Sequence, residues 1–163
     1  MTTVERQCGL YRTGTALAGK EGAVGAGQLV YFHNHSKQGP PIVLLPTTNE
    51  RNRWSFDERG YLIDGLGADG FLESLVALPR EGFYAVLEPV GVTDGRVLAA
   101  RSVVQVGYNR AGEAILFPGE AHGNGFVFPT AGFRFDGLTV FQRLREAGFD
   151  PPSVEPPAPH LLH

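Results

Sequence analysis

Residues 103–117 read VVQVGYNRAGEAILF, and this stretch decides the fold class. Its two ends, residues 103–108 and 113–117, carry apolar, β-branched and aromatic side chains in the alternating order of a half-buried strand. The middle, Asn109-Arg110-Ala111-Gly112, combines residues that favour turns. Two such runs around a short turn are typical of a β-hairpin, so the sequence predicts antiparallel strands here.

The same pattern recurs on both sides of this stretch. Glycine and proline contribute 22 and 12 residues, and this excess favours short elements joined by many turns. Pro46 should end the strand that precedes it, because proline cannot donate to a ladder. Further strands are expected at residues 28–35, 42–45, 52–56 and 82–90, and as a pair at 125–128 with 133–135.

Two segments follow the helical period instead. Residues 68–78 place Phe71, Leu72 and Leu75 on one side, and residues 136–146 begin at a capping aspartate. The strands are joined by connections of hairpin length, which argues against a doubly wound parallel sheet. The sequence therefore predicts an α+β fold, with a mainly antiparallel curved sheet or partly open barrel of about eight to ten short strands and two packed helices.

Length and composition predict a single domain over residues 1–149, followed by a proline-rich tail over residues 150–163. No apolar run approaches the length of a membrane span, and the first residues lack the pattern of a signal peptide. Cys8 is the single cysteine, which excludes an intramolecular disulfide, and its apolar neighbours favour a buried thiol. We therefore expect a cytoplasmic protein that does not associate with membranes.

The formal net charge of −3 argues against direct binding to nucleic acid, which needs a basic surface. The glycine-rich residues 22–27 lack the buried strand before them and the helix after them that a dinucleotide site requires. No Gly-Lys-Ser/Thr of a phosphate-binding loop and no Gly-x-Ser-x-Gly is present. The sequence thus predicts neither enzymatic activity nor a cofactor.

His33 and His35 form the sharpest chemical pair. Residues two apart on a strand share a face, so both imidazoles could hold one metal ion. A third ligand would have to come from His122, Asp57 or Glu58. The alternative is the polar end of a strand that emerges into solvent.

A dense polar cluster surrounds the only tryptophan of the chain. Carboxylates and guanidinium groups beside an aromatic side chain are typical of a protein-recognition surface with a central anchor. The alternative is that Trp54 belongs to the core and the charges form a solvated rim. The candidate partner-binding residues are Glu50, Arg51, Arg53, Trp54, Asp57 and Glu58.

Three runs resemble one known family. Residues 29–36 (LVYFHNHS), 106–110 (VGYNR) and 115–117 (ILF) resemble those of small acidic immunity proteins, which are encoded beside polymorphic lipoprotein toxins with nuclease-type tails in bacterial kin-recognition systems. The resemblance spans about residues 8–149. It implies a protein that binds a cognate toxin domain, such as a nuclease, and neutralises it by stoichiometric contact. No site residue carries over, because that family has no defined binding motif.

We accordingly expect an immunity protein that is a monomer or homodimer and not an enzyme. Two other functions stay open at this point. One is a β-rich domain that binds a small ligand or a metal ion through His33 and His35, with or without enzymatic activity. The other is a structural accessory protein that assembles with itself.

Overall fold

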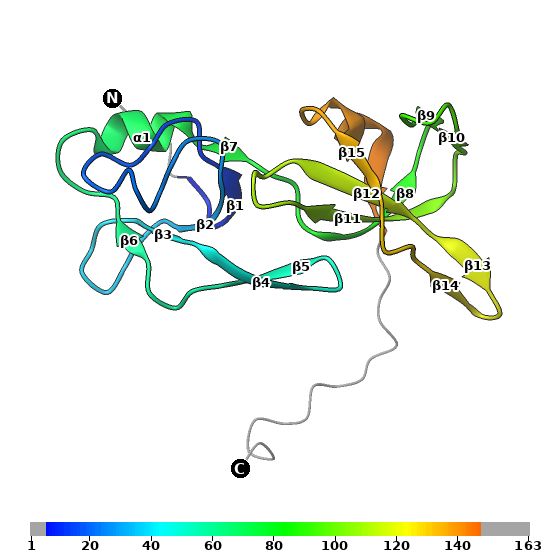
Figure 1. Cartoon of the computed structure of the whole chain (residues 1–163), viewed down its shortest axis with the longest axis horizontal. Coiled ribbons are helices and arrows are strands. Elements are labelled where there is room, and N and C mark those ends of the chain that lie inside the picture. Colours follow the sequence, from blue (N-terminus) through cyan, green and yellow to red (C-terminus); the bar gives the residue numbers. More distant parts are fainter. Residues whose placement is uncertain (1–5, 148–163) are drawn as a thin grey trace, which may run out of the picture.

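The computed structural model describes residues 6–147, and in these the chain forms two five-stranded antiparallel sheets that lie side by side along the long axis (Figure 1). The expected proline-rich tail at residues 150–163 lies outside the described residues. The first sheet consists, in order across it, of β6 (Tyr61–Leu62), β3 (Ile42–Leu44), β2 (Leu29–His33), β1 (Gly9–Arg12) and β7 (Val76–Ala77).

The second sheet is built around residues 103–117, which form its two central strands and the turn between them. Its strands, in order across the sheet, are β15 (Phe133–Phe135), β12 (Ala114–Pro118), β11 (Val103–Tyr108), β8 (Gly82–Val86) and β16 (Leu144–Glu146). The predicted β11–β12 hairpin is confirmed, with Tyr108 opposite Ala114. Its turn is held by the Asn109 side chain, whose Oδ1 accepts hydrogen bonds from the backbone of Ala111 at 3.1 Å and Glu113 at 2.9 Å.

Three two-stranded ladders complete the described β-structure. They are β4 (Pro46–Glu50) with β5 (Arg53–Phe56), β9 (Val90–Gly91) with β10 (Val97–Leu98), and β13 (Glu120–His122) with β14 (Gly125–Val127). The predicted mainly antiparallel sheet structure is confirmed, but with one α-helix in the described residues the fold is mainly β and not α+β. The strands of residues 6–147 number sixteen, more than expected because many span only two or three residues, and they close no barrel.

One of the two predicted helices is present. Helix α1 (Ala68–Ser74) begins where the helical pattern begins, and it buries Phe71 against the first sheet. It ends four residues early because the backbone turns extended at Leu75 and Val76 then pairs with Arg12 of β1. A tertiary pairing has taken over residues whose side-chain spacing alone is compatible with a helix.

The second predicted helix, at residues 136–146, is wrong. Gly137 lies at a φ of 72°, and a short 3₁₀ helix, η1 (Thr139–Arg143), follows. Leu144 then pairs with Val86 at the edge of the second sheet. Leu144 is buried there, so the sheet edge competes successfully with the weak helical pattern.

One strand prediction is confirmed and another is wrong. β3 ends at Leu44, before Pro46, as expected, although Pro46 itself opens β4 opposite Phe56 of β5. Residues 125–127 do not pair with residues 133–135; β14 pairs with β13, and β15 pairs with β12. Alternation identifies a strand but not its partner, because pairing depends on contacts distant in sequence.

Each sheet has its own hydrophobic core, and β2 contributes to both. Val30 and Phe32 are buried in the first core, together with Leu17 and Val24 of the glycine-rich segment. Leu29 is buried in the second core, and its N–H donates to the Arg110 carbonyl at 2.8 Å. The prediction of one domain stays a prediction, since the two sheets have separate cores and are joined at this strand.

Candidate functional site

The β4–β5 hairpin carries most of the partner-binding residues expected from the sequence. Glu50 lies opposite Arg53, which leaves Arg51 and Asn52 as a two-residue loop with φ of 52° and 65°. Two positive φ values define the type I′ turn that matches the twist of a hairpin, and Asn is well suited to it, whereas Arg is not.

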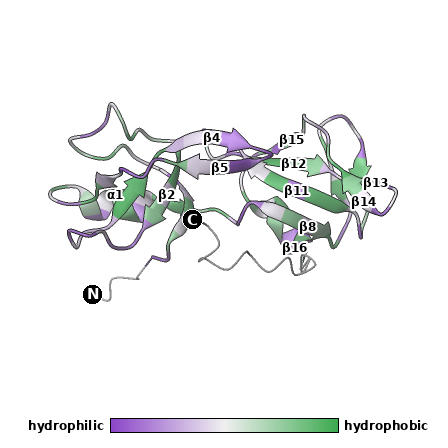
Figure 2. Cartoon of the chain, turned by 90° about the horizontal axis from the view of Figure 1, so that it is seen from below, coloured by the Kyte–Doolittle hydropathy of each residue, from purple (hydrophilic) through white to green (hydrophobic). Residues whose placement is uncertain are grey.

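The tip of this hairpin rests on the second sheet (Figure 2). Asn52 Nδ2 donates to Gln105 Oε1 at 2.9 Å, and Gln105 Nε2 donates to the Arg51 carbonyl at 2.8 Å. A Cβ atom built at Gly107 of β11 would lie 3.0 Å from the Asn52 Cβ, so glycine lets the two backbones approach. The hairpin is therefore docked within the molecule at its tip.

Trp54 is engaged on both its ring and its N–H. Its Nε1 donates to the Tyr108 carbonyl at 2.6 Å, and the guanidinium carbon of Arg110 lies 5.0 Å from the ring centroid. Arg110 in turn donates to the carbonyls of Pro46 at 3.2 Å and Thr47 at 3.1 Å. Trp54 thus joins the hairpin to the second core, with the ring half-buried.

Glu81 forms a hydrogen bond with the same strand. Its Oε2 accepts a hydrogen bond from the Trp54 backbone N–H at 3.1 Å. Burial raises the pKa of the Glu81 carboxyl, while the hydrogen bond from Trp54 and the charge of Arg53 act in the opposite direction. Burial therefore makes the ionised form of this carboxyl less favourable in the folded protein than in water.

The remaining charged candidates are exposed and fall into two groups. Glu50, Arg51 and Arg53 lie at the docked tip. Asp57 accepts a hydrogen bond from the Arg59 N–H at 3.0 Å, and Glu58 beside it lines a separate groove. The six residues expected to form one surface are thus separated: Trp54 and the three tip charges belong to the docked hairpin, whereas Asp57 and Glu58 lie after it.

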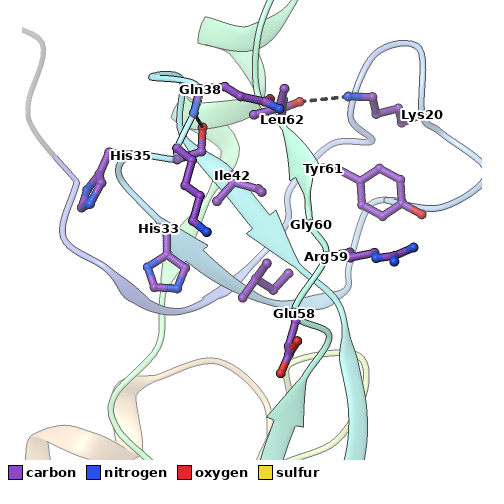
Figure 3. A pocket seen from close by; sticks show the side chains of 13 residues that line it. Lys20, His33, His35, Gln38, Ile42, Glu58, Arg59, Gly60, Tyr61 and Leu62 are labelled. Carbon is purple, nitrogen blue, oxygen red and sulfur yellow. Dashed lines mark hydrogen bonds between the residues drawn. The ribbon is translucent and has the colours of Figure 1, made fainter.

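That groove, with a volume of about 880 Å³, lies over β3 and β6 (Figure 3). Its floor is apolar, because Ile42 of β3 lies opposite Leu62 of β6 and Leu44 follows on β3. Gly60 completes the floor, because a Cβ atom there would lie 2.5 Å from the Val43 carbonyl oxygen and from Leu44 Cδ2. We call this site the cationic groove, after three cations that line it: Lys20, Lys37 and Arg59. His33, His35 and Glu58 also line it.

The structure thus brings His33, His35 and Glu58 to one site, as the metal hypothesis required. Nevertheless, no group of three or more His, Cys, Asp or Glu side chains within residues 6–147 is placed to hold a metal ion. His35 Nδ1 lies 2.6 Å from Asn34 Oδ1, and the His33 ring packs on Tyr31 with centroids 4.9 Å apart. The imidazoles are thus engaged with other partners.

Cys8 is exposed, so the expectation of a buried thiol is wrong. Its Sγ lies 3.4 Å from both the side-chain oxygen and the backbone N of Asn34. The apolar residues after it belong to β1, but the cysteine itself precedes that strand. Position relative to the strand, not the character of its neighbours, decides its exposure.

A second surface feature includes the strand that the sequence predicted at residues 125–128, but its exposure was not predicted. The β13–β14 hairpin is exposed at every residue, with Phe126 46% and Val127 56% exposed. The next aromatic residue, Phe128, contacts Phe83 of β8 with ring centroids 5.2 Å apart. We call β13, β14 and Phe128 the aromatic arm; Figure 1 shows it projecting from the second sheet. Apolar residues between Gly123 and Pro129 were its only signal in the sequence.

The docked hairpin and the aromatic arm contact the same face of the second sheet. Val104 and Val106 point into the core, so Gln105 and Gly107 point to the opposite face, which we call the outer face. Phe83 is the register partner of Gln105 and shares that face. The hairpin tip contacts Gln105, and the arm contacts Phe83 beside it.

In the described part of the chain, no helix is long and apolar enough to cross a membrane. Comparisons of the chain with protein-family models, with curated proteins and with solved structures gave no match.

Proposed function

We propose that the chain is a protein-binding module that acts in the cytoplasm by stoichiometric contact, without catalysis, and that its partner is a cognate bacterial toxin domain. The observation that carries protein binding is the aromatic arm, which exposes Phe126 and Val127 and contacts a partly exposed Phe83 through Phe128. Neighbouring exposed apolar side chains on a soluble protein mark contact sites, whereas single ones do not.

The outer face supports this proposal through its composition. Interfaces commonly have an apolar or aromatic centre and a polar, charged rim. Here the aromatic arm supplies the apolar part, and the docked tip supplies the exposed charges of Glu50, Arg51 and Arg53 on the same face. Docking fixes the hairpin in advance, which reduces the ordering entropy that binding would otherwise cost.

The identity of the partner rests on the resemblance to immunity proteins. The net charge of −3 favours approach to a basic surface such as the substrate groove of a nuclease. Because the charge is small, we expect the apolar contact to determine most of the affinity and the charges to influence mainly the association rate.

The test is co-expression with the toxin domain encoded beside this gene, scored by growth and by co-purification. The wild-type chain should restore growth and co-purify at equal stoichiometry. The double variant Phe126→Ser with Val127→Ser should lower the affinity by about 30-fold, the effect of losing an interface hot spot. Leu66→Ser is the matched control, because Leu66 is 97% exposed on a loop that leads into α1, away from the outer face.

A third variant tests the charges. Glu50→Gln with Arg53→Gln should alter the association rate and its dependence on salt more than the dissociation rate. Full potency of the arm variant would remove the arm from the contact. A wild-type chain that neither binds the toxin domain nor restores growth would overturn the proposed function.

A further inference from the structure

We infer that the cationic groove binds a small organic anion, one whose carboxylate or phosphate group is attached to an apolar or planar body. This inference concerns the first sheet and does not depend on the proposed function, which concerns the outer face of the second.

The charge of the groove is opposite to that of the protein. The chain has only two lysines, Lys20 and Lys37, and both line the groove together with Arg59. Glu58 is the one carboxylate among the lining residues, so the formal charge there is positive while the whole chain is at −3. A concave surface lined by one sign of charge concentrates ions of the other sign.

The floor of the groove favours a ligand that has an apolar or planar body in addition to its negative charge. Ile42, Leu44 and Leu62 offer apolar surface, and Tyr61 adds an aromatic ring near the rim. A free inorganic anion would leave this surface in contact with water. The volume of about 880 Å³ lies within the range typical of small-molecule sites, so a ligand with an apolar or planar body fits the floor as well as the rim.

The rim groups lie on two sides of the floor. Figure 3 shows His33 and His35 on one side of Ile42, and Lys20, Tyr61 and Arg59 on the other. The cations Lys20 and Arg59 therefore approach a bound anion from the side of Ile42 opposite the two histidines.

Other occupants fit less well. β6 is an edge strand, and an added peptide strand would need its free backbone groups. Lys20 Nζ already donates to the Leu62 carbonyl at 3.2 Å, which engages that edge. A metal cation would be repelled by the lysines and Arg59, and it would lack a three-ligand group in residues 6–147. A small organic anion needs neither the free edge of β6 nor a group of three metal ligands.

The experiment is a titration of the full chain followed by NMR and calorimetry at low ionic strength. Adenosine monophosphate represents a phosphate on a planar body, octanoate represents a carboxylate on an apolar body, and inorganic phosphate is the headgroup alone. We expect one of the two organic anions to bind at least about tenfold more tightly than inorganic phosphate, because it buries part of the floor. Shifts should centre on residues 33–38 and 58–62, and binding should weaken in 0.5 M salt.

Three variants test the assignment of charges. Lys37→Gln with Arg59→Gln should weaken binding by about tenfold, and Glu58→Gln should strengthen it by about threefold, since it removes the opposing charge. Arg145→Gln, an exposed cation on β16 of the second sheet, is the matched control and should change nothing.

Several results would overturn the inference. These are the absence of binding by both organic anions at millimolar concentration, equal binding of inorganic phosphate, weaker binding by Glu58→Gln, or an Arg145→Gln effect as large as that of the groove variants. None of them bears on the toxin-binding experiment, whose variants lie on the aromatic arm and the hairpin tip.

Discussion

The β4–β5 hairpin and the aromatic arm are both short two-stranded ladders that leave a main sheet, yet they are used in opposite ways. The first binds back to the molecule through Asn52, Trp54 and Arg110. The second leaves both its strands exposed and contacts the sheet through Phe128. The β4–β5 hairpin, whose tryptophan and charges resemble a recognition surface, therefore stabilises the fold.

This contrast shows that residue type does not separate internal from external recognition. Tryptophan and arginine are enriched at interface hot spots because a large ring and a planar cation bind strongly wherever they are desolvated. At Trp54 that binding is directed to the Tyr108 carbonyl and Arg110 of the same chain. An isolated hairpin is marginally stable in water, so a docked one gains stability from the sheet it contacts.

The largest expected effect is on stability, and it tests whether the β4–β5 hairpin and the aromatic arm differ in their contribution to the fold. Trp54→Ala should lower the free energy of unfolding by about 3 kcal/mol, because it removes a packed ring and the partner of Arg110. Phe126→Ala, the matched change on the arm, should alter it by less than about 0.5 kcal/mol, since the side chain is exposed. Chemical denaturation of both variants checks this. Equal losses would mean that the arm is as much a part of the fold as the hairpin.

A smaller and opposite effect is expected at the hairpin loop. Arg51 has a φ of 52°, a conformation that costs a non-glycine residue about 1 kcal/mol and that asparagine tolerates better. Arg51→Asn should therefore raise the free energy of unfolding by about 0.5 kcal/mol. The control is Arg53→Asn on β5, which has no positive φ and should give no gain. A gain in the control alone would show that charge, not backbone strain, matters at this tip.

The smallest expected effect is a pH dependence of stability at Glu81, which contacts Trp54 of the β4–β5 hairpin. Because burial raises the pKa of Glu81 above 4.5, the folded state holds this proton more tightly than the unfolded state. Stability contributed through Glu81 is thus present below pH 4.5 and is lost as the pH rises through the folded-state value. Glu81→Gln keeps an acceptor for the Trp54 N–H, so it should be at least as stable as wild type at pH 7, with the difference vanishing near pH 4.5.

Glu113 is the matched control for this measurement. The Asn109 side chain donates to its carboxylate and, with Arg134 nearby, lowers the pKa of Glu113. Stability from this group is present above 4.5 and is lost as the pH falls, so Glu113→Gln should change the pH profile in the opposite direction. Unfolding curves between pH 4 and pH 7 that shift alike in both variants would contradict the two assignments.

The cationic groove could be predicted only in part. His33 and His35 both line it and Glu58 was among their expected neighbours, although β2 ends at His33 and the strand spacing does not extend to His35. Lys20 and Lys37 come from a glycine-rich segment and from the turn after β2, and nothing in their local pattern connects them. The rarity of lysine in the chain was the one available signal.

Local alternation and turn residues are sufficient to predict the β11–β12 hairpin, a strand at β2 and the start of α1. These features depend on neighbours within a few residues, where side-chain period and backbone preference act directly. Only the tertiary structure decided that residues 144–146 form a strand, that β14 pairs with β13, and that Trp54 turns inward. Each of those outcomes is a competition between partners far apart in the chain, and their relative free energies arise only when the sheets and cores come together.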